Sequence, residues 1–401
     1  MMRGRPKQGG QMRRRIAAPQ LLVGTLAVAV AGALAAQLLT WGPRWWRVNE
    51  TTGRPTSSVS ASAGSLRTLT AREAGEAFLS GYVESDGRVT RRDEGGDTVS
   101  EGQAYAMLVA AALNDRQHFT TVWAWTKRNL ARKDGLLAWR WKDGQLVDNA
   151  SASDADLDAA RALVIAAAAF GDDQLKAEGV RLGTAVLDKE TVMTKVGRVL
   201  VSGSWANHAP YAYNPSYTSP AANALLADAT GDKRWTELDL GTRAVTTALL
   251  NSADLPPDWA QVHPDGRIEA MPGAAGYVDE GVRYGYDATR MPIRFAESCH
   301  PADVALAARL TPALDRSVGD PATRDLGGAP LLSEESVVAA AAKAAALAAD
   351  GQTARAASQL MSADHLQQVK PTYYGAAWNA LGWLMLSGET LGGCPPMVGA
   401  I

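Results

Sequence analysis

Residues 153–171, SDADLDAARALVIAAAAFG, contain both the start and the end of a single helix. Ser153 and Asp156 have the spacing of an N-terminal capping box, in which two side chains satisfy free N–H groups of the first turn. A nearly continuous apolar run follows, and Gly171 is the residue type that often ends a helix in the left-handed conformation. The pattern therefore predicts one well-delimited helix.

Similar signals recur along the chain and predict an all-α fold. They lie at Thr70, Ser100, Ser219, Pro220, Gly231, Ser333 and Gly351. With loops included, one helix occurs about every 25–30 residues, a spacing that suits stacked helical hairpins. Residues 71–401 would hold about twelve helices, enough for two concentric rings in an (α/α)6 barrel. A solenoid is the competing arrangement; no repeated consensus favours it, but helix content alone does not separate the two.

The first 70 residues have a different composition. Arginine and lysine are frequent in residues 1–15, and an uncharged run occupies residues 16–39. That run is long enough to span a bilayer and exceeds the roughly 7–15 residues of a signal-peptide core. Residues 40–70 begin with tryptophans and continue as a Ser/Thr-rich linker.

The N-terminal pattern predicts where the rest of the chain lies. Positive charge before the apolar run keeps residues 1–15 in the cytoplasm. We expect residues 16–39 to be a transmembrane anchor, in preference to a cleaved signal segment. The domain of residues 71–401 would then face outside, on the extracellular face of the cytoplasmic membrane, or be secreted if the segment is cleaved.

Charge, histidine and cysteine content exclude several classes of function. The 40 basic and 42 acidic residues give a formal net charge of -2, and without a basic stripe beyond the N-terminus we expect no nucleic-acid partner. Motifs for phosphate loops, dinucleotide binding, serine hydrolases and zinc proteases are absent. Five scattered histidines and two cysteines predict neither a metal site nor a cofactor. Cys299 and Cys394 are expected to form either one disulfide or two buried thiols.

Carboxylates at helix starts are the remaining candidates for chemistry. Glu101 lies in VSEGQAYAM, residues 99–107, where Ser100 and Gln103 suggest another capping box. On its own, Glu101 is typical of an acid that interacts favourably with the helix dipole. Gly102 beside it would let another group approach closely.

Three aspartates crowd the start of the helix at residues 153–171. We expect Asp156 to complete the cap and Asp158 to face solvent, which leaves Asp154 without a local structural role. The segment does not match an EF-hand calcium-binding loop, because it lacks the loop glycine and the distal glutamate.

A third acid, Asp287, lies between Tyr286 and Arg290 in VRYGYDATRMPIR, residues 282–294. A helix cap is the plain alternative for Asp287. Aromatic residues lie in the segments near the three acids, and as a set they suggest a groove for a polymer. They are Trp139, Trp141, Trp205, Tyr211, Tyr213, Tyr217, Tyr373 and Tyr374.

Five ordered blocks resemble the family 8 glycoside hydrolases, especially the bacterial endoglucanases linked to cellulose biosynthesis. They are SEGQAYAMLVAAALND, WAWTKRNL with LLAWRW, SASDADLDAARAL, NPSYTSPA and GYDATRMPIR. The resemblance implies an (α/α)6 barrel that hydrolyses β-1,4-glucan with inversion. It carries the general acid onto Glu101, the general base onto Asp287 and a sugar-contacting role onto Asp154. Positions that match residues lining the cleft are Trp139, Trp205, Tyr217, Tyr286, Arg290 and Tyr373.

The chain departs from the family pattern at four small or charged positions. Ala159 and Arg161 stand where bulkier apolar or aromatic residues are usual, and Ala104 and Ala106 replace Ser and Gly. These changes concern packing and subsites more than reaction type.

The implied reaction needs one protonated and one ionised carboxyl group. The like charge of Asp154 and burial against aromatic rings would help Glu101 retain its proton. Asp287 is expected to stay ionised with the help of Arg290, although Arg290 would also be able to pair with Asp154.

Other interpretations remain open at this stage. In one alternative, the protein has the same fold and hydrolyses chitosan, xylan or mixed-linkage glucan. In another alternative, it binds glycans without cleaving them. Endo action is expected over exo action. A polysaccharide synthase complex is a candidate partner, with the polysaccharide substrate itself and the membrane.

Overall fold

The computed structural model describes residues 68–274, 281–388, 390–391 and 397. These residues belong to one compact unit. The predicted segments 1–15 and 16–39, and nearly all of the linker at 40–70, lie outside the described residues. Within the described part of the chain, no helix combines the length and apolar character needed to cross a membrane.

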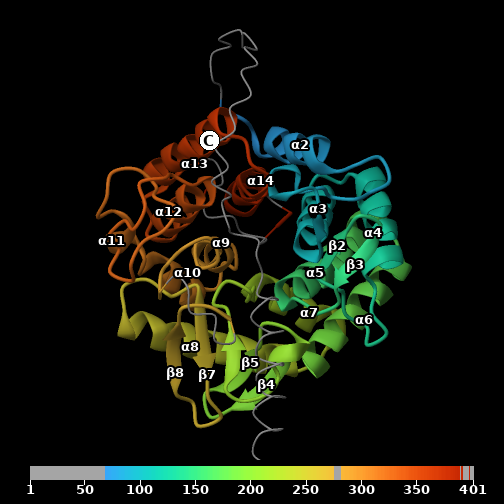
Figure 1. Ribbon diagram of the computed structural model, residues 1–401, viewed down its shortest axis with the longest axis horizontal. Helices are drawn as coiled ribbons and strands as arrows, with labels where there is room; N and C mark the ends of the chain where they lie inside the picture. Colours follow the sequence, from blue (N-terminus) through green and yellow to red (C-terminus); the bar gives the residue numbers. More distant parts are fainter. Residues whose placement is uncertain (1–67, 275–280, 389, 392–396, 398–401) are drawn as a thin grey trace, which may run out of the picture. The chain divides into compact units, whose positions relative to one another are not determined.

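Six helices form a closed inner ring (Figure 1). Each contacts the next in chain order, and α14 returns to contact α3. In order they are α3 (Ser100–Ala112), α5 (Ser153–Phe170), α7 (Pro220–Thr230), α9 (Arg290–Ala296), α12 (Val337–Ala349) and α14 (Tyr373–Ser387). Closure of the ring distinguishes this fold from a solenoid, whose ends do not meet.

An outer layer of helices alternates with the inner ring along the chain and packs against it. These helices are α2 (Ala71–Tyr82), α4 (Arg116–Leu130), α6 (Asp173–Lys189), α8 (Arg234–Ser252), α10 (Pro301–Ala308) and α13 (Thr353–Val369), with the short α11 (Thr311–Leu314) after α10. The double ring confirms the predicted (α/α)6 barrel.

Burial explains why the inner helices are so rich in alanine. Eleven residues of the inner helix α12, VVAAAAKAAALAA, are buried, because it packs against both rings. The outer helix α13 buries four residues, among them Leu360 and Asp364, and turns the rest toward solvent. Small side chains let packed helices approach closely, so the composition of the inner ring follows from its position.

Several predicted helix ends are confirmed. Thr70 and Glu73 form a full capping box, and Ser219 accepts the Ala222 N–H ahead of a helix that begins at Pro220. Helices α5 and α7 end at left-handed glycines, as predicted.

Two predicted capping boxes are wrong, although the helices start within a residue of the expected place. Neither α3 nor α5 has a side-chain cap. The Gln103 side chain instead accepts the Val89 N–H at 2.6 Å. Asp156 accepts the Leu137 N–H at 2.8 Å. Both side chains bind backbone N–H groups of neighbouring segments, because their helices are buried on nearly every face and other segments lie within hydrogen-bond distance.

Three small antiparallel sheets, which the sequence did not indicate, join the helices. The first contains β1 (Thr98–Val99), β2 (Arg140–Lys142) and β3 (Gln145–Asp148), and the second contains β4 (Thr191–Thr194) and β5 (Gly197–Leu200). The third contains β6 (Tyr211–Tyr213), β7 (Trp259–Val262) and β8 (Ile268–Met271). Strand β1 runs directly into α3 and thereby fixes the start of that helix.

Other differences concern helix limits and the cysteines. Helix α12 begins at Val337, four residues after the predicted start at Ser333. Cys299 is disulfide-bonded, and the only other cysteine of the sequence, Cys394, lies outside the described residues.

Candidate active site

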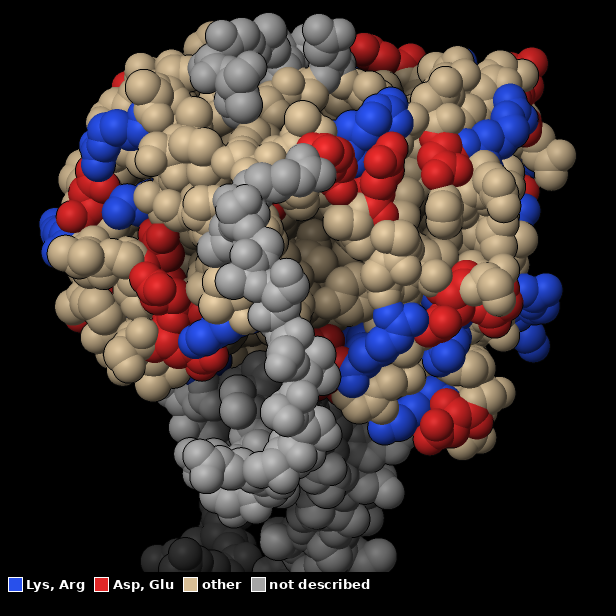
Figure 2. Space-filling view, turned by 90° about the horizontal axis from the view of Figure 1, so that it is seen from above, with Lys and Arg blue, Asp and Glu red and all other residues tan. Residues whose placement is uncertain are grey.

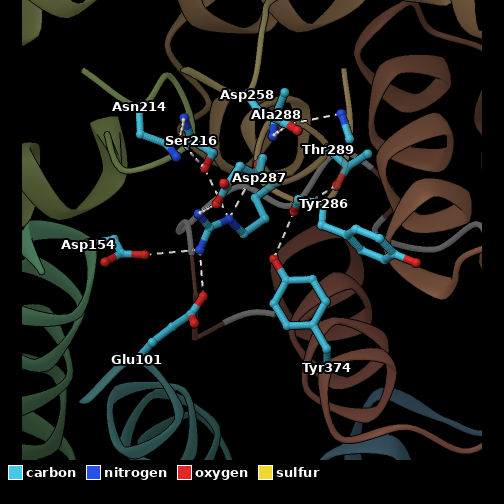
Figure 3. Close-up of polar contacts among 12 residues, drawn as sticks. Glu101, Asp154, Asn214, Ser216, Asp258, Tyr286, Asp287, Ala288, Thr289 and Tyr374 are labelled. Atoms are coloured by element: carbon cyan, nitrogen blue, oxygen red, sulfur yellow. Dashed lines mark hydrogen bonds and ion pairs between the residues drawn. The ribbon is translucent and has the colours of Figure 1, made fainter. Parts of the chain in front are cut away.

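One guanidinium group gathers the three acids singled out in the sequence (Figure 3). Arg290 Nη1 lies 2.5 Å from Glu101 Oε1 and 3.0 Å from Asp154 Oδ2. Its Nη2 lies 2.7 Å from Asp287 Oδ1. We call these four residues the Arg290 cluster. Arg290 therefore pairs with both aspartates that the sequence offered as alternatives, and with the glutamate as well.

The barrel explains why residues so far apart in sequence meet here. Inner helices alternate with outer ones, so successive inner helices run in the same direction and begin at the same end of the ring. Glu101 and Asp154 are the second residues of α3 and α5, and Arg290 is the first residue of α9. Asp287 lies in the turn that leads into α9.

The cluster is buried and carries more negative than positive charge. The side chains of Arg290, Asp154 and Asp287 are 1%, 3% and 7% exposed, and that of Glu101 is 17% exposed. Burial raises the pKa of Asp154 to about 6 and that of Asp287 to about 8, and Arg290 opposes both shifts. The ion pair expected between Arg290 and Asp287 is present, but it does not keep the pKa of Asp287 low.

Neighbouring polar groups orient the Arg290 side chain. Its Nε donates to Ser216 Oγ at 3.0 Å, and Ser216 Oγ donates to Asn214 Oδ1 at 2.7 Å. The Tyr217 ring lies 5.2 Å from the guanidinium carbon, in cation–π contact. All three guanidinium nitrogens and one face of the group therefore have protein partners.

Tyr105 is a cluster neighbour that the sequence analysis missed. Its hydroxyl donates to Glu101 Oε1 and accepts from Arg290 Nη1 at 3.1 Å. Residues four apart on a helix share a face, so the spacing of Glu101 and Tyr105 carried a usable signal. Ser216 offered no such signal, because Arg290 lies 74 residues away, and Asn214 acts only through Ser216.

Three predicted aromatic residues are partly exposed and lie in segments next to those that carry the cluster. Trp205 is 42% exposed, and its Nε1 donates to the backbone oxygen of Ser151 at 3.1 Å. Trp139 is half-buried and accepts the Ser100 N–H through its backbone oxygen at 2.9 Å. Tyr286 is also half-buried and precedes Asp287 in the chain.

Tyr373 lies beneath the site and not on the predicted cleft surface. Its side chain is 1% exposed and packs against Phe78 and Tyr82. A Cβ at position 102 would collide with the Tyr373 hydroxyl, so Gly102 does permit the close approach expected of it. Tyr374, the next residue, lies near Arg290 and the three acids, and its hydroxyl donates to the backbone oxygen of Tyr286 at 2.9 Å.

One other expectation for the aspartate helix is wrong. Asp158 does not face solvent; it accepts two hydrogen bonds from Arg294, at 2.8 and 2.6 Å, and is 1% exposed. Arg161, unusual for its position, pairs with Glu297 at 2.8 and 2.9 Å. Both ion pairs lie inside the barrel and join α5 to the α9 segment.

Charge elsewhere on the molecule is mixed. Figure 2 shows Lys and Arg side chains interspersed with Asp and Glu over one face. Among the described residues, no three His, Cys, Asp or Glu side chains are grouped so as to hold a metal ion. The predicted lack of a metal or cofactor stays a prediction.

Comparison with known sequences identifies similar proteins. The model of the family "Glycosyl hydrolases family 8" matches residues 52–386. A probable endoglucanase of Novacetimonas hansenii is 31% identical over 225 residues, which cover 54% of this chain and 64% of that protein. The Cellulomonas uda endoglucanase is 30% identical over 231 residues, which cover 56% and 62%. The chain thus spans under two thirds of the length of these curated relatives.

Solved structures share the fold. The endo-β-1,4-glucanase CMCax from Acetobacter xylinum matches with a TM-score of 0.66 at 26% identity, covering 80% of this chain and 99% of that one. A β-1,3-1,4-glucanase from Paenibacillus sp. X4 matches with a TM-score of 0.69 at 19% identity, covering 78% and 90%. At the lower identity, the likeness concerns the fold alone.

Proposed function

The chain belongs to glycosyl hydrolases family 8, and we propose that it is itself a glycoside hydrolase that cleaves β-1,4-glucan chains internally and with inversion. The observation that carries the proposal is the convergence of Glu101, Asp154 and Asp287 on one guanidinium. A protein that only binds glycans has no need of three buried carboxylates in one place. The endoglucanase names of the relatives support the choice of substrate.

Glu101 acts as the general acid in this proposal. It is the most exposed of the three carboxyl groups, so it is the one best able to reach a glycosidic oxygen. Tyr105 and Arg290 hold one of its oxygens, which leaves the other oxygen to carry the proton. A positioned acid of this kind contributes typically 10²–10⁴-fold to the rate.

Asp287 acts as the general base that activates a water molecule. In inverting enzymes the acid and base stand roughly 6.5–9.5 Å apart, so that a water fits between the base and the sugar. Asp287 accepts from Arg290 through Oδ1, and its second oxygen is the one assigned to the water. Inversion follows from the family pattern and is the part of the proposal that product stereochemistry tests.

The shortage of positive charge keeps a proton in the cluster, and the proposed reaction requires that proton on Glu101 while Asp287 is ionised. Because burial raises the pKa of Asp287 to about 8, that state becomes populated as the pH rises toward this value. If all three acids of the Arg290 cluster were ionised, two negative charges would remain buried without a partner, which is strongly unfavourable. The cluster therefore holds at least one proton near neutral pH. Asp154 contributes through its charge and, in the proposal, through a contact with the sugar at the cleavage site.

The partly exposed aromatic residues would bind the glucan chain. Trp205 offers an exposed indole face, and Trp139 and Tyr286 offer partly exposed rings. Such rings stack on the apolar faces of sugars. Tyr217 packs against Arg290, so in the proposal it supports the Arg290 cluster and does not stack on the sugar.

The direct test is hydrolysis of a panel of polysaccharides by the full-length protein. We expect carboxymethylcellulose to lose viscosity well before reducing ends accumulate, which is the mark of endo cleavage. Mixed-linkage glucan, xylan and chitosan are the alternative substrates, and preference for one of them would replace the cellulose assignment. Binding to all four without hydrolysis would support a glycan-binding protein instead.

Stereochemistry is tested separately. In ¹H NMR of the first products, we expect the α-anomer to appear before mutarotation equilibrates the signals. Initial β-anomer would mean retention, and Asp287 would then lose its assignment as the base that activates water.

Location and partners form a further part of the proposal. The uncharged run at residues 16–39, preceded by basic residues, supports an anchor that leaves the hydrolase domain outside the cytoplasmic membrane. A polysaccharide synthase complex is the partner that such a location suggests. Resistance of the full-length protein to alkaline extraction from membranes tests the anchor, and release of a shortened protein into the medium would indicate cleavage.

A further inference from the structure

Asp258 is a buried acid close to the Arg290 cluster that the proposed reaction does not use. It directly precedes β7 and is 7% exposed. Figure 3 shows its carboxylate next to the turn that carries Asp287. Nothing in the sequence around Asp258 marked it as a functional residue.

One oxygen of Asp258 holds the backbone on both sides of Asp287. Its Oδ1 accepts the N–H groups of Gly285 and Ala288, each at 2.8 Å. Its Oδ2 accepts from Arg283 Nε at 3.3 Å. These bonds matter because Asp287 precedes α9 and is not held by regular helix hydrogen bonds; without Asp258, the Ala288 N–H would be a buried donor lacking a partner.

The fit between Asp258 and the turn is tight. A Cβ on Gly285 would lie 2.7 Å from Asp258 Oδ2, closer than real contacts allow. The glycine therefore lets the carboxylate sit directly under the backbone. The Asp258 N–H also donates to the Arg283 backbone oxygen at 2.8 Å. Both the backbone and the side chain of Asp258 therefore bind the segment of residues 283–288.

Asp258 also contributes to the charge that surrounds Asp287. Burial is the main cause of the raised pKa of Asp287, and Arg290 opposes it; Asp258 is the strongest of the negative charges that add to it. The titratable groups that face Asp287 are Arg290 on α9, Glu101 on α3, Asp154 on α5, Tyr374 on α14, and Tyr217 and Asp258 in loops.

We propose that Asp258 is a positioning residue for Asp287, which it orients through two backbone amides and backs with a second negative charge. The inference rests on the proposed role of Asp287 as the base. In the structure Asp258 makes no hydrogen bond to the three acids or to the guanidinium; it acts through the backbone of the turn and through its charge.

The informative variant is Asp258→Asn. Its amide oxygen still accepts both backbone N–H groups, so the turn keeps its anchor while the charge is lost. We expect kcat at the optimum to stay within about threefold of wild type, and the acid limb of the pH–rate profile to move down by roughly 0.5–1 pH unit. Asp258→Ala removes the acceptor as well, and there we expect kcat to fall roughly 10-fold or more with little change in KM.

A matched control is Asp364→Asn. Asp364 is likewise fully buried and accepts a backbone N–H, from Leu69 at 2.8 Å, but it lies on α13 of the outer ring. This variant is expected to lose stability without moving the acid limb. If Asp258→Asn also leaves the limb in place, or if Asp258→Ala keeps wild-type kcat, the positioning role is wrong.

A direct titration separates this inference from the proposed function. The carboxyl carbon of Asp287 can be followed by ¹³C NMR and assigned by its loss in Asp287→Asn. We expect its midpoint to fall in Asp258→Asn even if the protein proves inactive on every glucan. A midpoint unchanged from wild type would overturn the role of Asp258 whatever the activity shows.

Discussion

Buried charged side chains join helices α5 and α9 at two levels, one helical turn apart. The positive and negative charges balance at one level and not at the other. At one level Arg294 pairs with Asp158 alone, through two hydrogen bonds, and both side chains are at most 1% exposed. One turn away, Arg290 faces three acids at once. The two helices therefore share a neutral ion pair at one level. At the other level, Glu101 on α3 and Asp287 before α9 add two more carboxylates to the pair of Arg290 and Asp154.

The difference shows which level is built for chemistry. In the bidentate pair of Arg294 and Asp158, each charge is neutralised by the other through two hydrogen bonds. The cluster holds surplus carboxylates, and burial raises the pKa values of Asp154 and Asp287. Only the second arrangement combines surplus buried carboxylates with a partly exposed one, Glu101.

The largest expected effect tests the imbalanced level. Glu101→Gln and Asp287→Asn should each lower kcat by roughly 10²–10⁴-fold, while the melting temperature stays within a few degrees of wild type. Steady-state kinetics and thermal unfolding measure the two effects. Asp173→Asn, which removes an exposed helix-start acid from α6, is the matched control; near-wild-type kcat in Glu101→Gln would rule out the proposed acid.

Removing one partner of the balanced Arg294–Asp158 pair should lower the free energy of unfolding. Asp158→Ala leaves Arg294 buried and unpaired, so we expect unfolding to become easier by about 3–5 kcal/mol. The double variant Asp158→Leu with Arg294→Met should recover most of that loss, because neither charge remains. Denaturant unfolding measures both, and a single variant as stable as wild type would contradict a structural role for the pair.

The pH dependence of activity should report the raised pKa of Asp287. A base works only when ionised, so the rate should fall as pH drops through a value above the ordinary aspartate pKa of about 3.9. Asp154→Asn removes a like charge that adds to this shift, and its acid limb should move to lower pH. An acid limb in wild type at or below the ordinary value would show that the base is not buried as described.

The smallest effect concerns a second pair of buried acids, Glu190 and Asp156. Burial raises the pKa of Glu190 to about 8, and Ser151 donates to its carboxyl at 2.7 Å. The folded state therefore keeps a proton that the unfolded chain has already released above its own pKa, so stability falls as pH rises between the two values. In Glu190→Gln the decline of Tm between about pH 5 and 8 should be shallower by roughly 2–4 °C; equal slopes would contradict the assignment.

The sequence predicted helix boundaries well where the signal was local. The Thr70 box, the Ser219 cap and the glycine ends of α5 and α7 rest on residues within four positions of one another. The boxes at Ser100 and Ser153 failed because tertiary neighbours took Gln103 and Asp156. Local patterns cannot register competition from segments that are distant in the chain.

The sequence predicted which residues belong to the candidate site, but not which of them pair with one another. Glu101, Asp154, Asp287 and Arg290 were all named, since each lies beside a recognisable helix start. Which acid Arg290 would bind stayed open, and the answer is all three. Asp258 was missed, because its partners lie 27 and 30 residues away and are backbone amides without a side-chain signature.

By itself, the sequence determined that this chain forms many alanine-rich helices and places acids at their starts, because helix periodicity and helix ends depend on neighbours a turn away. Only the tertiary structure decided that the helices close into a ring, that the Tyr374 hydroxyl binds the backbone next to Asp287, and that one arginine pairs with three carboxylates. The contacts of that arginine alone join residues 189 positions apart. They depend on how the rings pack, and no short stretch of sequence contains that information.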